Sequence, residues 1–163
     1  MPRLLVVHHS PTPTVQALTD RVVAGAGDAA IEGVEVVVRP ALEARADDVL
    51  AADGVVLGTT ANFGYMSGAL KHFFDTIFLE AGGALSDDGS AASGGGGGKK
   101  PFGLYVHGGY DTAGAVRSVE SIVGALPWRQ AAPALEVLGD PSAEQLAAAY
   151  ELGATIAAVL SVA

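Results

Sequence analysis

The chain has 163 residues, of which 50% are hydrophobic and 17% charged, with a mean hydropathy of +0.38. This composition is typical of a globular protein and excludes a disordered chain, and the length predicts a single domain over residues 1–163. The formal net charge of −9 disfavours binding to nucleic acids or anionic membranes. The absence of cysteine excludes disulfides, thiolate metal sites and a cysteine nucleophile.

Two apolar runs stand near the ends of the sequence, and both are short. Residues 4–7 are too few for the core of a signal peptide, and the run over residues 152–163 is too short to span a bilayer. We therefore expect a cytoplasmic protein that is not inserted in a membrane.

Short apolar segments alternate with amphipathic ones along the chain. The apolar segments predict five strands, at residues 4–8, 34–39, 54–59, 102–107 and 134–138. Helical faces are predicted by apolar or small residues at helical spacing: Val15, Leu18, Val22 and Ala26; Met66, Leu70, Phe73 and Ile77; Val116, Val119 and Val123; and Leu146, Tyr150, Gly153, Ala157 and Leu160. Ser142 and Gln145 form a capping box that begins the last helix.

The second crossover has the weakest helical pattern. Residues 41–52 offer Leu42, Val49 and Leu50 as apolar anchors, which predicts a short or irregular helix. Even so, strands that are apolar on both faces and joined by helices need cover on each side of a parallel sheet. The expected fold class is therefore α/β, with a doubly wound, five-stranded parallel sheet and helices on both faces.

Eight of the 22 glycines lie between Gly82 and Gly98. Within this region, residues 86–98 have the composition of a flexible linker and no apolar periodicity. We expect a flexible Gly-rich loop at about residues 82–100, inserted in one domain and not separating two.

The loop after the first strand carries hydroxyl groups into a helix. Ser10, Thr12 and Thr14 would add donors to the free N–H groups of a helix N-terminus, which together predict a phosphate site without a cation. An alternative is that these residues merely cap the helix. Ligands of open parallel sheets bind beyond the carboxyl ends of the strands, so this loop is well placed for a site.

Two further loops should meet it at that edge. After the third strand, Phe63 and Tyr65 suit a flat ligand, or alternatively pack to anchor their loop. After the fourth strand, Gly108 and Gly109 would let the backbone approach a ligand closely. A simple turn into the next helix, with Asp111 or Thr112 as N-cap, explains the last segment almost as well.

Two segments resemble known proteins. Residues 10–14 (SPTPT) resemble the phosphate loop of flavodoxins. Residues 52–78 resemble the flavin-ring segment of the flavodoxin-like NAD(P)H-dependent FMN and quinone reductases, with a glycine-threonine-x-x-x-phenylalanine-glycine turn followed by methionine-serine-glycine. Pro13 stands where flavodoxins usually carry glycine, and Thr60 where these reductases usually carry proline. The resemblance implies a flavodoxin-like fold.

The resemblance also implies FMN as the cofactor. Its phosphate would lie on the loop of Ser10, Thr12, Pro13, Thr14 and Val15, with the N–H groups of Thr14 and Val15 as donors. Its ring would lie against Thr60, Ala61, Asn62, Phe63 and Gly64, and against His107, Gly108, Gly109 and Tyr110.

The function implied is an FMN-dependent oxidoreductase that transfers hydride from NAD(P)H to a quinone-like or other small acceptor. The flavin carries this chemistry, so no catalytic side chain and no metal is expected. One alternative is a flavodoxin-type carrier of single electrons that docks with a redox protein, which the acidity favours. Another is a degenerate flavodoxin-like module that does not bind FMN. We also expect a homo-oligomer.

Overall fold

The computed structural model describes residues 1–90 and 100–163. Its strands are β1 (Arg3–His8), β2 (Glu35–Pro40), β3 (Gly54–Asn62), β4 (Tyr65–Met66), β5 (Lys100–Gly108), β6 (Trp128–Gln130) and β7 (Leu135–Leu138). Its helices are α1 (Pro13–Ala26), α2 (Ala46–Ala51), α3 (Gly68–Ile77), α4 (Ala113–Val123) and α5 (Ala143–Ser161). Strands and helices alternate along most of the chain, as the apolar segments predict.

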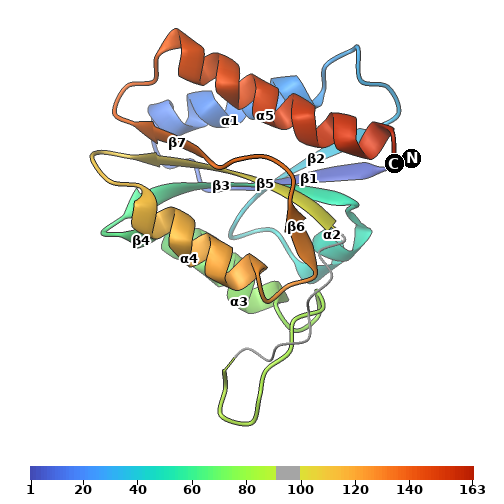
Figure 1. The fold of residues 1–163 in the computed structure, drawn as a ribbon, viewed down its shortest axis with the longest axis vertical. Coiled ribbons are helices and arrows are strands. Elements are labelled where there is room, and N and C mark those ends of the chain that lie inside the picture. Colours follow the sequence, from blue (N-terminus) through green and yellow to red (C-terminus); the bar gives the residue numbers. More distant parts are fainter. Residues whose placement is uncertain (91–99) are drawn as a thin grey trace.

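The sheet has the strand order β2-β1-β3-β5-β6, and these pairings are parallel. Helices α1 and α5 lie on one face of the sheet, and α3 and α4 lie on the other (Figure 1). Each face holds its own buried apolar cluster, one containing Leu18 of α1 and Ile156 of α5 and the other containing Phe73 of α3 and Val119 of α4. The predicted doubly wound α/β architecture is confirmed.

The last strand position is shared by two segments. β7 lies where the sequence predicts the fifth strand, while β6 is an additional three-residue strand, and both pair with β5. Trp128 alone of the three β6 residues is buried, so the segment has no apolar alternation from which a strand is predicted. β4 is also additional: its two residues form an antiparallel pair with the end of β3.

Three apolar positions differ from the sequence prediction. Met66 is buried but lies in β4, because Ser67 caps α3 by accepting the Leu70 N–H at 3.1 Å, and the helix begins at Gly68. In the second crossover, α2 is short, as predicted. Of its expected anchors, however, only Val49 is buried, while Leu42 and Leu50 are exposed.

The capping box of the last helix is confirmed. Ser142 Oγ accepts the Gln145 N–H at 3.1 Å, and the Gln145 side chain accepts the Ser142 N–H at 2.9 Å. In the Gly-rich region, a backbone bond from Ser86 to Ser90 closes a short turn, and residues 91–99 lie outside the described part of the chain. Over the described residues, we find no helix with the length and apolarity that a membrane span requires.

Candidate functional site

The carboxyl ends of β1, β3 and β5 lie side by side in the sheet. Their register places His8 of β1 beside Gly58 of β3, and Gly58 beside Tyr105 of β5. The order of the strands reverses at β1, so the loops that follow these strands meet at the switch point where open α/β sheets bind ligands.

The first of these loops ends in the N-terminus of α1. Thr12 is the N-cap, and its hydroxyl accepts the Val15 N–H over a long 3.4 Å contact. Pro13 has no N–H to offer. No described residue accepts from the Thr14 N–H. The loop therefore presents the Thr14 N–H and the hydroxyl proton of Thr12, whereas the Val15 N–H is already engaged.

Ser10 takes part in a hydrogen-bonded chain that leads into the protein. Its Oγ lies 2.8 Å from His8 Nδ1 and 2.8 Å from Thr19 Oγ1. Thr19 Oγ1 in turn lies 2.6 Å from the hydroxyl of Tyr105. Thr19 and Tyr105 are buried, and Ser10 is partly exposed. The sequence pattern indicates Ser10 but not these partners, because Tyr105 follows Ser10 by 95 residues and has the pattern of an ordinary core residue of a strand.

The second loop is the tight turn between β3 and β4. Asn62 pairs with Tyr65, leaving Phe63 and Gly64 as a two-residue turn with φ values of 51° and 78°. Hairpin turns with two positive φ values favour Asn-Gly or Gly-Gly, and a bulky residue in this conformation is strained. Among the described residues, Phe63 is the one non-glycine with positive φ. The side chain of Phe63 is fully exposed to solvent.

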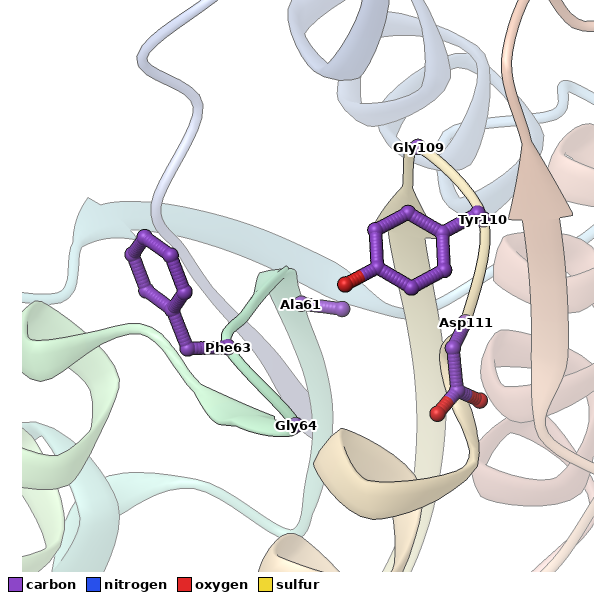
Figure 2. A pocket seen from close by; sticks show the side chains of 6 residues that line it. All are labelled: Ala61, Phe63, Gly64, Gly109, Tyr110 and Asp111. Atoms are coloured by element: carbon purple, nitrogen blue, oxygen red, sulfur yellow. The ribbon is translucent and has the colours of Figure 1, made fainter.

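A cavity of about 100 Å³ lies between this turn and the loop after β5. It is lined by Ala61, Phe63, Gly64, Gly109, Tyr110 and Asp111. Phe63 and Tyr110 stand on either side of Ala61 (Figure 2), and both rings are exposed. Asp111 is the one charged residue of the lining. The cavity therefore has aromatic walls and a negative charge.

Thr60, the residue before Ala61 in β3, carries a buried polar atom without a partner. Thr60 Oγ1, near the end of β3, is shielded from solvent and has no hydrogen-bond partner among the described residues. Its neighbour Thr59 is fully bonded, because its hydroxyl donates to the Thr60 carbonyl at 2.8 Å and accepts the Ser67 N–H at 2.9 Å. Buried hydroxyls are rarely left unpaired, which indicates that a ligand group or water completes Thr60.

Comparison with known proteins identifies the architecture. No family model matches the chain. A flavodoxin from the domain Archaea superposes with a TM-score of 0.75 at 17% identity, covering 97% of this chain and 98% of that one. A flavodoxin from Streptococcus pneumoniae TIGR4 gives 0.73 at 18% identity, with 96% and 99% covered. The chain has a flavodoxin-like fold.

A curated flavodoxin from Aquifex aeolicus (strain VF5) is also similar in sequence. It is 33% identical over 85 residues, which are 52% of this chain and 45% of that protein. The matched part therefore spans less than half of the relative. These similarities are to flavodoxins, and none of them points specifically to an NAD(P)H-dependent quinone reductase.

Within the flavodoxin-like fold, most of the residues singled out in the sequence gather at one edge of the sheet. His107 also lies at this edge, paired with Thr60 in the register of β3 and β5, but its Nε2–H donates to the Gly139 carbonyl at 2.8 Å and so ties β5 to the loop before α5. Thr112 is the N-cap residue of α4, but its hydroxyl donates to Glu136 at 2.8 Å, and it is Asp111 that accepts the Ala113 N–H.

No metal-binding group of three His, Asp or Glu residues occurs over residues 1–90 and 100–163.

Proposed function

We propose that this chain binds FMN and carries electrons to or from a redox protein. The observation that carries the proposal is the aromatic-walled cavity beside a hydroxyl-rich helix N-terminus, both at the switch point of a flavodoxin-like sheet. The sequence similarity to a flavodoxin supports the same cofactor.

The residues present fit FMN. A phosphate needs donors, and Thr12, Thr14 and Ser10 would supply hydroxyls with the Thr14 N–H beside them. A flat ring needs apolar faces and a few polar contacts, which the exposed rings of Phe63 and Tyr110 and the unpartnered Thr60 hydroxyl would provide. The ring would lie against residues 60–64 and 108–110.

When bound, FMN supplies reversible uptake of electrons, which no protein side chain offers. The chain itself would position the ring and set the local field. The cavity lining carries Asp111 and no cation, so negative charge added to a bound ring is not offset there and reduction is made harder. The net charge of −9 would steer the protein to a basic partner.

A second function is an NAD(P)H-dependent FMN oxidoreductase with a quinone-like or other small acceptor. The full exposure of Phe63 favours this oxidoreductase, because a hydride donor must reach an open face of the flavin ring. The electron-carrier function agrees better with the acidic lining of the cavity and with the similarity to flavodoxins. The homo-oligomer expected from the sequence stays a prediction.

The test is the visible spectrum of the purified protein with FMN, recorded anaerobically. A carrier is reduced by a reduced redox protein but keeps its flavin absorbance when NADH or NADPH is added. Bleaching by either nucleotide at a catalytic rate would favour the oxidoreductase instead. A preparation that remains colourless after FMN is added would show that the chain is a module without the cofactor.

A further inference from the structure

The hydrogen-bonded chain from Tyr105 to His8 has a direction fixed by burial. The Tyr105 hydroxyl is fully buried and contacts Thr19 Oγ1 alone among the described polar groups. Burial raises its pKa, which keeps the phenol protonated. Because a buried O–H must find an acceptor, Tyr105 donates to Thr19.

Because Thr19 accepts from Tyr105, its own hydroxyl proton is available for another acceptor. Thr19 lies 2.8 Å from Ser10 Oγ and is itself 2% exposed, so it donates to Ser10. A serine hydroxyl has one proton and two acceptor positions. With one position filled by Thr19, the remaining contact of Ser10 is His8 Nδ1.

His8 therefore decides where the Ser10 proton goes. In the neutral tautomer that carries its proton on Nε2, Nδ1 accepts from Ser10, which then has no proton for a ligand. When Nδ1 is protonated, it donates to Ser10, whose acceptor positions are both filled and whose O–H is released toward the loop.

Resting on the proposed FMN function, we propose that Tyr105 is a positioning residue: acting through Thr19, it makes Ser10 an acceptor and couples donation by Ser10 to the FMN phosphate to protonation of His8. The fold makes this contact possible because Gly58, between His8 and Tyr105 in the register, has no side chain to block the tyrosine ring.

The surroundings of His8 set how readily it takes up a proton. Burial lowers the pKa of His8, His9 directly after β1 lowers it further, and Asp20 on α1 opposes both effects. The neighbouring strands present Pro40 and Gly58, which are uncharged. A phosphate dianion at the loop would favour the cationic form of His8, so binding of FMN should take up a proton.

The test measures FMN and riboflavin affinity as a function of pH, because riboflavin lacks the phosphate. Tyr105→Phe should lower the FMN-to-riboflavin affinity ratio about tenfold, the change expected for one hydrogen bond to a charged group, and should flatten the rise of this ratio as pH falls. His8→Asn should flatten the same profile. Any pH dependence of the ratio that remains in this variant is due to titration of the FMN phosphate itself. Tyr150→Phe, which removes a hydroxyl on α5 that is bonded to Asp28 in the loop after α1, should leave both the affinity ratio and its pH profile unchanged.

A second pair of variants covers the case in which Tyr105→Phe does not fold. Thr19→Val should reproduce its effects, and Thr19→Ser, which keeps the hydroxyl, should restore the wild-type ratio. An FMN-to-riboflavin ratio and pH profile that are unchanged in Tyr105→Phe or Thr19→Val would overturn the proposal.

The His8 ring nitrogens, observed by NMR in the ligand-free protein, separate this proposal from the proposed function. Their chemical shifts and titration should change in Tyr105→Phe and not in Tyr150→Phe, and identical spectra would show that no such coupling exists. A wild-type protein that binds neither flavin would instead overturn the proposed function.

Discussion

The ring of Tyr105 occupies the space that a side chain at position 58 would fill. A Cβ built on Gly58 would stand 2.1 Å from Tyr105 Cζ and 2.2 Å from its hydroxyl oxygen. Because Gly58 has no side chain, the ring of Tyr105 on β5 lies over β3 and its hydroxyl contacts Thr19 on α1.

Gly58→Ala should therefore destabilise the protein. The new methyl group must displace a fully buried ring, and such overpacking costs about 1–3 kcal/mol. The measurement is urea unfolding, with Gly109→Ala as the matched control, because a Cβ at Gly109 meets no atom within 4 Å. Equal stability of the two variants would show that Tyr105 has room to move.

Thr12→Ala should weaken FMN binding roughly ten- to a hundredfold, since a hydrogen bond to a charged acceptor contributes about 1.5–3 kcal/mol. Riboflavin affinity should change little. Thr12 also caps α1, so Ser142→Ala, which removes the corresponding cap of α5, is the control for a loss of about 1 kcal/mol in stability. If FMN and riboflavin weaken equally, Thr12 does not hold the phosphate.

Phe63→Asn should make the protein more stable and its flavin binding weaker. Asparagine tolerates the φ of 51° at this position and precedes Gly64 in the favoured turn pair, which relieves about 1 kcal/mol of strain. Loss of the exposed ring removes one wall of the cavity.

Thermal unfolding and flavin titration of the same variant measure the two effects. Tyr110→Asn is the comparison, because it removes the other exposed ring from a residue without positive φ. Its flavin affinity should fall with no gain in stability. A Phe63→Asn protein that is no more stable than wild type would argue against strain in the turn.

Stability should decrease as the solution is acidified through the titration of His8. Burial, followed by the charge of His9, lowers the pKa of His8 below 6.5. The unfolded chain therefore binds a proton first as pH falls, so stability is complete above about pH 6.5 and is lost progressively down to the folded pKa.

Urea unfolding of wild type and His8→Asn between about pH 8 and pH 5 measures this dependence. The variant should lose the part of the slope that His8 contributes, whereas replacement of the exposed His72 by asparagine is the control. Parallel profiles of wild type and His8→Asn would contradict the burial of an uncharged His8.

The sequence by itself determined five of the strands, most helices and the fold class, because these depend on local apolar patterns. Val15, Leu18 and Val22 form the buried face of α1 at the predicted spacing, and Ser142 caps α5 as predicted. The sequence also indicated the three loops of the candidate site, since a parallel sheet brings the carboxyl ends of its strands to one edge.

The tertiary structure alone decided which side chains contact one another there. His107 and Tyr105 are two residues apart on one strand, yet the first bonds Gly139 and the second reaches Thr19, 86 residues away. Such contacts depend on strand register and on the space left by Gly58, which no local pattern encodes. β6 and β4 were likewise missed, because two or three residues become a strand only when β5 or β3 is already there to pair with them.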